Sequence, residues 1–152
     1  MSGMIYSYAD SERMRKMRQV EHNEQVQFFI YLRLLEGAGV EEAKMAFAVP
    51  NGLRVASIRV AKRAVAEGLR AGVPDIIVPI ARGGKHGLAI EMKSSITKKH
   101  STKIQKEWQA KLRMQGWEVV ECHSPIIALR AFIDYCELTP LQYRILSGII
   151  DE

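Results

Sequence analysis

The stretch "GVPDIIVPIARGGKHGLAIEMKSS", residues 72–95, decides the fold because it holds two apolar runs separated by a glycine-rich segment. The runs "DIIVPI" and "GLAIEMK" are short and bounded by turn-forming residues, so we expect each to form a strand. Joined by "ARGGKHG", they predict an antiparallel hairpin. Three charged residues, Asp75, Glu91 and Lys93, interrupt these apolar strands. Charges are costly in a buried strand unless they are paired or have a function.

The spacing of these three charges suggests a common purpose. Side chains alternate along a strand, so Glu91 and Lys93 share one face, and hairpin pairing can bring Asp75 beside Glu91. Two adjacent carboxylates repel each other unless one keeps a proton or a cation lies between them. Oxygen ligands of this kind favour Mg²⁺ or Mn²⁺. Lys93 would orient an attacking water or stabilise charge on a phosphate, so the set suits phosphodiester hydrolysis.

A simpler interpretation of the same residues remains open on spacing alone. An aspartate at the start of a strand is often a turn residue, and Glu-x-Lys is a common surface pair. The apolar setting of both strands and the charge distribution around them favour the catalytic interpretation.

The rest of the chain predicts one α/β domain. The expected elements are a helix over residues 19–36, a strand over 44–50, a mostly helical segment over 56–72, a helix over 101–115, a strand over 117–122, a helix over 124–138 and a short final helix from 139. In the helix over 101–115, Ser101 is the expected N-cap, and Ile104, Trp108 and Leu112 form the expected buried stripe. A strand-helix-strand order near the end implies a parallel pair. We therefore expect a mixed sheet of about four strands with helices on both faces.

Basic residues flank the hairpin on both sides. The chain has 152 residues and a net charge of +5, with five basic residues against one acid in 51–70 and seven against one in 93–113. A DNA backbone rewards such a layout because each neutralised phosphate releases counterions. The expected backbone contacts are Arg54, Arg59, Lys62, Arg63, Arg82, Lys85, Lys98, Lys99 and Lys103.

Other classes of protein are disfavoured. The two cysteines, Cys122 and Cys136, match no CxxC or zinc pattern, and we expect both to be buried thiols. No apolar run approaches the length of a membrane span, and the N-terminus lacks an apolar signal core. We expect a cytoplasmic protein, in the bacterial host cytoplasm if it is phage-encoded.

Residues 72–95, followed by "STKIQKEWQAKLRMQGWEVVEC", resemble the VRR-NUC family of PD-(D/E)XK nucleases, in particular its small stand-alone members from phages and bacteria. The resemblance spans residues 20–138 and includes "EHNEQVQFF", "AVPNG" and "AEGLRAGVPD". It implies a restriction-endonuclease-like core, a divalent metal, and cleavage of DNA, often at branched or flap structures.

The resemblance also implies roles for individual residues. Asp75, Glu91 and Lys93 match the family's catalytic positions, and Gln105 matches its glutamine position. Family members carry a further acid on the first helix, for which Glu21 and Glu24 are candidates. On a helical wheel Glu21 lies at the centre of the apolar stripe, so we favour it over Glu24. By analogy, the main-chain carbonyl of Met92 would also bind the metal.

The resulting prediction is a nuclease with three parts: an N-terminal arm over residues 1–18, expected to be mobile, a VRR-NUC domain over 19–138, and a helical extension over 139–152. We expect a homodimer, because small members of the family resemble junction resolvases. The expected activity is structure-selective cleavage of branched, junction or flap DNA. Two rivals are a non-catalytic DNA-binding module on the same fold and an interaction protein whose charges are surface pairs.

Overall fold

The computed structural model describes residues 8–50, 57–96 and 100–151, with side chains from residue 12 onward. Predicted DNA contacts at Arg54, Lys98 and Lys99 therefore lie outside the described residues. The elements follow in this order: α1 (Tyr8–Gly37), the 3-10 helix η1 (Glu41–Met45), β1 (Phe47–Ala48), α2 (Ile58–Ala66), β2 (Ile76–Val78), β3 (Leu88–Met92), α3 (Lys103–Met114), β4 (Glu118–Cys122), α4 (Pro125–Tyr135), α5 (Pro140–Tyr143), the 3-10 helix η2 (Arg144–Leu146) and α6 (Ser147–Ile150).

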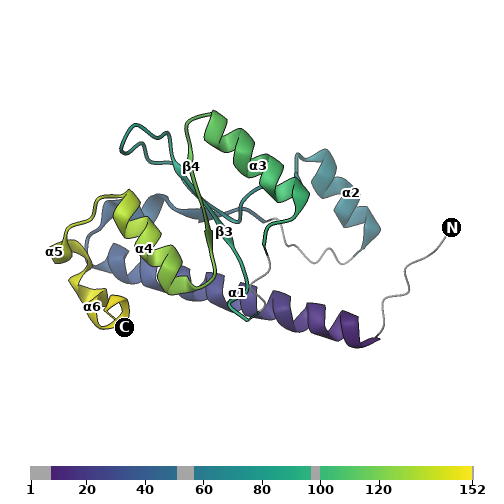
Figure 1. The fold of residues 1–152 in the computed structure, drawn as a ribbon, viewed down its shortest axis with the longest axis horizontal. Helices are drawn as coiled ribbons and strands as arrows, with labels where there is room; N and C mark the ends of the chain where they lie inside the picture. The colour runs from purple at the N-terminus through teal and green to yellow at the C-terminus, as the bar shows by residue number, and fades with distance from the viewer. Residues whose placement is uncertain (1–7, 51–56, 97–99, 152) are drawn as a thin grey trace.

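The strands form one mixed sheet in the order β1-β2-β3-β4 (Figure 1). The hairpin is antiparallel, with Ile76 opposite Ile90 and Val78 opposite Leu88. Strands β3 and β4 are parallel, and Glu91 pairs with Glu121. The predicted hairpin and the predicted parallel pair are both confirmed, and so is the α/β fold class with a four-stranded mixed sheet and flanking helices.

The two faces of β3 meet different surroundings. Leu88, Ile90 and Met92 point into the main apolar core, which also contains Phe28 of α1 and Phe132 of α4. Ala89 and Glu91 point to the opposite face, which α3 covers. All five residues of β3 are buried, so the strand is enclosed from both sides. A carboxylate held at Glu91 is therefore removed from bulk water.

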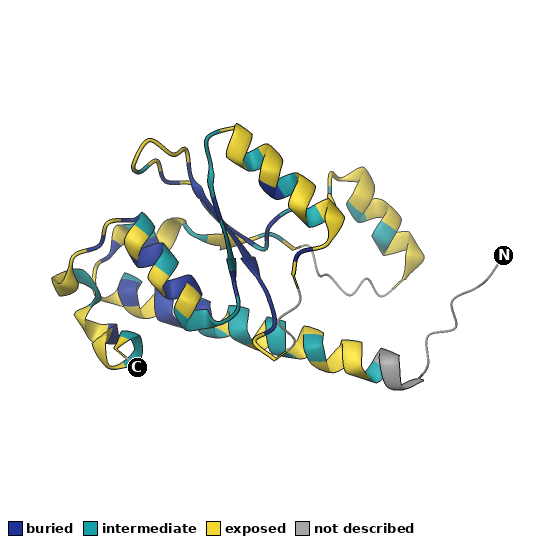
Figure 2. Cartoon of the chain, viewed as in Figure 1, coloured by how far each residue is buried: buried dark blue, intermediate teal, exposed yellow. Residues whose placement is uncertain are grey.

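Helix α1 is longer than expected. It begins at Tyr8 rather than near residue 19, so residues 8–18 of the predicted arm continue the helix. Its second half packs against the sheet and α4, while residues 12–20 project past the sheet and are mostly exposed (Figure 2). Helix α1 ends at Gly37, and Gly39 follows with a positive φ of 87°, as the two glycines predicted. The boundaries proposed at residues 19 and 138 stay predictions.

Two predictions about α3 are wrong. Its N-cap is Thr102, whose side chain accepts a hydrogen bond from the Gln105 N–H, and not Ser101. Its buried residue is Gln109, whereas Ile104 is 53% exposed. The apolar periodicity misled because α3 packs on the polar face of β3 and β4, where amide side chains find hydrogen-bond partners.

The predicted final helix is also wrong in detail, because residues 139–150 form three short segments, α5, η2 and α6. Leu146 at the end of η2 is fully buried in the core, whereas Leu141 is 70% and Ile145 53% exposed. The helix changes type after Tyr143, and Leu146 of the following 3-10 turn is part of the core. The extension is thus docked on the domain.

Two further expectations concern the cysteines and membrane spans. Cys122 and Cys136 are free and buried, as predicted, and burial raises their pKa values to about 11 and about 12. Across the described ranges, none of the helices is both long enough and apolar enough to cross a bilayer.

Candidate active site

Asp75 is held at the point where the chain enters β2. Gly72, with φ of 85°, turns the chain back against Ile104 of α3, and the buried Pro74 follows. The main-chain oxygen of Asp75 accepts a hydrogen bond from the Val49 N–H at 2.7 Å. Its side-chain Oδ2 accepts one from the Met92 N–H at 2.8 Å, across the end of the hairpin. The two strand ends that carry Asp75 and Glu91 are therefore fastened together.

Glu91, Lys93 and Gln105 form a closed triangle of hydrogen bonds. The Lys93 ammonium donates to Glu91 Oε1 at 2.8 Å and to Gln105 Oε1 at 3.0 Å. The Gln105 amide Nε2 donates to the same Glu91 oxygen. Glu91 is 1% and Lys93 7% exposed. The predicted triad and the predicted glutamine thus lie in one buried cluster, with Asp75 at its edge.

The orientation of the Gln105 amide is fixed by the start of α3. Gln105 is the third residue of the helix, and its Oε1 accepts a hydrogen bond from the Thr102 N–H at 2.8 Å in a capping box. This oxygen also faces the Lys93 ammonium, which can only donate. The amide nitrogen must therefore point to Glu91. The capping box at the start of α3 thus orients the Gln105 amide for its contact with Glu91.

The electrostatics of the cluster favour a bound cation or proton. Burial and, after it, the neighbouring Asp75 carboxylate raise the pKa of Glu91 to about 7 against the opposing effect of Lys93. Burial also raises the pKa of Asp75, although the Met92 N–H and Lys93 oppose this. Both carboxylates resist ionisation, as expected for adjacent acids in an apolar setting. Perturbed acids of this kind gather at functional sites.

The acids of α1 approach from the other side of the strand end. Oε1 of Glu21 accepts a hydrogen bond from the Ser94 N–H at 3.2 Å, and Oε2 of Glu24 accepts one from the Ser95 N–H at 3.4 Å. The Glu21 carboxylate also contributes to the raised pKa of Asp75. Glu21 is therefore electrostatically coupled to the site, which supports the preference for Glu21 over Glu24.

The donor set fits a hard divalent cation in one specific respect. Oε2 of Glu91 is buried and has no hydrogen-bond partner within the described part of the chain. An unpaired buried carboxylate oxygen is costly, and a cation shared with Asp75 would relieve both the missing partner and the repulsion. Within the described ranges, no three His, Cys, Asp or Glu side chains converge tightly enough to form a complete metal site. Main-chain oxygen, water or substrate would therefore complete the coordination shell, as is usual for Mg²⁺.

A second polar cluster adjoins the first and was not predicted. Glu121, the β4 partner of Glu91, accepts hydrogen bonds from the N–H and hydroxyl of Ser101, and Gln109 donates to that hydroxyl at 2.8 Å. His123 Nε2 lies 3.3 Å from Glu121 Oε1. Burial favours the neutral form of Glu121, but the bonds from Ser101 and the attraction of Lys93 outweigh it, so its pKa is lowered. The parallel pairing of β3 with β4 was predicted, but not its register. A register that pairs Glu91 with Glu121 would have predicted this cluster.

The predicted DNA contacts are distributed over several surfaces. Arg59, Lys62 and Arg63 lie on α2, an exposed helix with no buried residue, and Lys103 opens α3 near the cluster. Arg82 and Lys85 lie in the hairpin turn, at the opposite end of β2 and β3 from Asp75 and Glu91. Arg82 pairs there with Glu42 and Lys85 with Glu118. The structure thus separates the turn residues from the candidate site.

Comparison with known proteins points to one domain family. A sequence model of the VRR-NUC domain matches residues 15–125. A solved structure described as a VRR_NUC domain protein superposes with a TM-score of 0.60 and 24% sequence identity, over 76% of this chain and 89% of that one. At that identity the likeness shows the fold alone. No protein among the curated sequences is significantly similar to the chain.

The family match covers most of the chain, including most of α1, the hairpin, α3 and β4. A VRR-NUC domain indicates a nuclease-type function, in which the protein binds and cleaves DNA. The chain belongs to the VRR-NUC domain family.

Proposed function

We propose that this protein is a divalent-metal-dependent DNA endonuclease whose active site is the cluster of Asp75, Glu91, Lys93 and Gln105. The observation that carries the proposal is the unpartnered, buried Oε2 of Glu91 beside a second carboxylate and a buried lysine. A purely structural Glu-Lys pair would satisfy both carboxylate oxygens, because buried polar groups are normally hydrogen-bonded.

Asp75 and Glu91 would hold the Mg²⁺ or Mn²⁺ ion, with Glu21 and the Met92 carbonyl as the further proposed ligands. The N–H of Met92 faces Asp75, and the N–H and carbonyl of one strand residue point to the same side. When bound, the ion would polarise the scissile phosphodiester as a Lewis acid. Because ligand carboxylates must be ionised, binding would lower the pKa values that burial raises in Asp75 and Glu91.

Lys93 has the position and the charge to act on the phosphate. Its ammonium is held between Glu91 and Gln105, so it is pre-oriented and needs no rearrangement when charge develops. An ammonium in a buried site stabilises an oxyanion more strongly than it would in water. Gln105 would keep Lys93 and Glu91 aligned. The basic residues of α2, together with Lys103 at the start of α3, would hold the DNA backbone without reading the base sequence.

Selectivity for branched, junction or flap DNA and assembly as a homodimer are part of the same proposal. The exposed Leu141 and Ile145 on the C-terminal extension support a contact with a second copy. Analytical ultracentrifugation would show a dimer for the wild type and a monomer for Leu141→Asp/Ile145→Asp. A monomeric wild type at micromolar concentration would contradict this element of the proposal.

The central test is a cleavage assay with junction, flap, duplex and single-stranded DNA in Mg²⁺ or Mn²⁺. Asp75→Asn and Lys93→Met are expected to reduce cleavage at least about 100-fold, the loss seen when one stabilising group is removed from an active site. Lys111→Met, at an exposed lysine of α3, is the matched control and is expected to retain activity. Circular dichroism checks that each variant is folded.

Two results would overturn the proposal. One is the absence of cleavage of every substrate by the folded wild type with either metal, together with salt-dependent DNA binding, which would favour the non-catalytic module. The other is cleavage that Asp75→Asn and Lys93→Met leave undiminished.

A further inference from the structure

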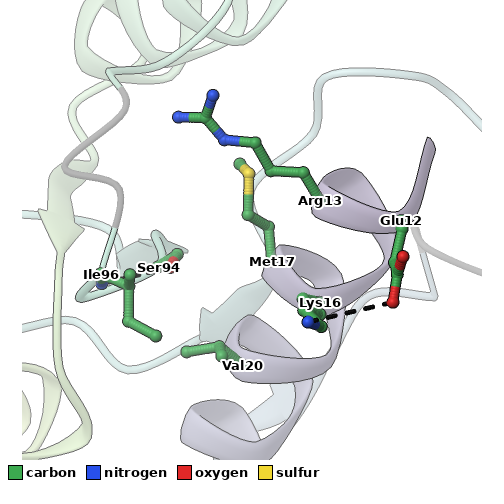
Figure 3. A pocket seen from close by; sticks show the side chains of 7 residues that line it. All are labelled: Glu12, Arg13, Lys16, Met17, Val20, Ser94 and Ile96. Atoms are coloured by element: carbon green, nitrogen blue, oxygen red, sulfur yellow. Dashed lines mark hydrogen bonds and ion pairs between the residues drawn. The ribbon is translucent and has the colours of Figure 1, made fainter. Parts of the chain in front are cut away.

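A groove of about 560 Å³ lies between the projecting first half of α1 and the segment that follows β3 (Figure 3). Its lining comes from α1 and from the segment after the strand: Glu12, Arg13, Lys16, Met17, Val20, Ser94 and Ile96. The volume is within the range of roughly 300–1,000 Å³ that is typical of ligand pockets. The groove is absent from the sequence-based expectations, because they placed no helix before residue 19.

The groove has an apolar floor and a basic rim. Met17, Val20 and the 74% exposed Ile96 supply apolar surface, and Arg13 and Lys16 lie along the helical edge (Figure 3). These α1 residues share one face, since positions three, four and seven apart on a helix are neighbours. Lys16 contacts Glu12 at 3.9 Å, but this exposed pair is weak and can be exchanged for another anion.

The groove adjoins the end of β3, the strand that carries Glu91. Ser94 lines the groove, directly follows Lys93 and donates its N–H to Glu21. Its hydroxyl accepts a hydrogen bond from the Ile96 N–H at 3.3 Å, which shapes the wall of the groove. A ligand in the groove would therefore lie at the end of β3, beside Ser94 and its partner Glu21.

We infer that this groove binds a single-stranded segment of the DNA substrate and delivers the adjoining phosphodiester to the active site. The inference rests on the proposed nuclease function. It specifies the substrate class further: DNA with unpaired nucleotides next to the cleaved bond. The rim would contact phosphates, and the floor would contact unstacked bases.

The chemistry of the groove favours a single strand over a duplex. A duplex keeps its bases stacked inside and exposes mainly phosphate and sugar, so the apolar residues of the groove would make no favourable contact with it. A single strand exposes base faces, and proteins that bind it combine a basic path for the backbone with a surface on which bases pack. A small apolar ligand would not require cations along one edge, and an acidic peptide would not require a groove that adjoins the strand end carrying Glu91 and Lys93.

The test uses the full chain in EDTA, where no metal-dependent cleavage can occur, with a fluorescent 12-nucleotide single strand and the matching duplex. Arg13→Gln/Lys16→Gln removes the two rim charges. Arg15→Gln/Arg18→Gln removes two charges from the same helix, roughly 140–200° around it from Arg13. Both pairs change the net charge equally, and neither Arg15 nor Arg18 lines the groove. Circular dichroism confirms that α1 remains helical in each.

The rim pair is expected to weaken single-strand binding at least fivefold, and the control pair less than twofold. Each lost phosphate contact lowers the salt slope for a single strand by about 0.7, so the rim pair should lower it by about 1.4. Met17→Ser should weaken binding without changing the salt slope, whereas Met14→Ser, outside the groove, should change neither. Equal losses from the rim pair and the control pair, equal losses for the duplex and the single strand, or no single-strand binding by the wild type would overturn the inference.

A parallel cleavage assay in Mg²⁺ or Mn²⁺ separates this inference from the proposed function. If the groove variants behave as expected but the wild type cleaves no DNA, the nuclease proposal fails and the groove stands as a binding site. If the wild type cleaves DNA and the rim pair cleaves substrates with unpaired nucleotides as well as the control pair does, the groove assignment alone fails.

Discussion

The ammonium of Lys93 lies 2.8 Å from Oε1 of Glu91, and the two side chains are 9% and 2% exposed. A buried pair of this kind is a weak source of stability, because desolvating both charges costs about as much as their attraction returns. Its retention in the middle of an apolar strand therefore points to function. The same burial makes the protonation state of Glu91 sensitive to pH and to bound cations.

The stability of the metal-free protein is expected to decrease as pH rises from about 4.5 to about 7. The Glu91 pKa is raised from 4.5 to about 7, so over this window the folded state keeps a proton that the unfolded chain has lost. At about 1.4 kcal/mol per pH unit, the free energy of unfolding should fall by roughly 3 kcal/mol and then level off. Urea denaturation in EDTA at several pH values measures this.

Glu91→Gln is the control for the pH dependence, because its side chain cannot ionise. Its unfolding free energy should vary less with pH across the same window, with only the smaller contribution of Asp75 remaining. A wild type whose slope matches that of Glu91→Gln would contradict the assignment.

Mn²⁺ should stabilise the folded protein at pH 7.5 and do so much less at pH 5.5, because protons compete for Asp75 and Glu91. At a concentration 100 times the Kd, a ligand of the folded state adds about 2.7 kcal/mol. For a chain of this size that is a Tm increase of roughly 5–10 °C. Differential scanning calorimetry with and without Mn²⁺ checks it.

Asp75→Asn should abolish the Mn²⁺-dependent increase in Tm. Asp134→Asn, at an exposed aspartate of α4, changes the net charge equally and should keep it. An increase in Tm that survives in Asp75→Asn would place the ion elsewhere.

Gln105→Ala should reduce the cleavage rate more than Thr102→Ala does. Both changes break the capping box of α3, at a typical cost of about 1 kcal/mol, but only the first removes the amide that contacts Glu91 and Lys93. Comparing kcat and unfolding free energy for the two variants separates helix capping from positioning of the cluster. Equal rate losses at equal stability losses would assign Gln105 to the cap alone.

Glu121→Gln should move the titration midpoint of Glu91 to lower pH, because the Glu121 carboxylate contributes to the raised pKa of its neighbour. Carbon-13 NMR titration of glutamate side chains in the metal-free protein would show this shift. Glu118→Gln removes a carboxylate at the other end of β4, where Glu118 pairs with Lys85, and should leave the midpoint in place. Identical shifts in both variants would indicate a general effect of net charge instead of a local contact.

The sequence alone was enough to predict the hairpin and the placement of Glu91 and Lys93 at the end of its second strand. Because side chains alternate along a strand, Glu91 and Lys93 of "GLAIEMK" lie on one face. The short loop "ARGGKHG" predicts that the two strands pair as a hairpin, which places Asp75 near them. These features could be predicted because strand periodicity and turn length are local properties. The resemblance to the family located Gln105 and Glu21, which periodicity alone would not have linked to residues far away in the chain.

Only the tertiary structure determined what surrounds these residues. Ile104 was predicted to be buried and is exposed, while Gln109 is buried, because the polar face of β3 and β4 decides which side of α3 is turned inward. The register of β3 with β4 placed Glu121 beside Glu91. The first half of α1, whose periodicity is weak, forms one wall of a groove whose other wall comes from residues after β3. The contact of Glu21 with Ser94 joins residues more than 70 positions apart. All of these contacts depend on how helices and strands pack, so they cannot be inferred from a local pattern.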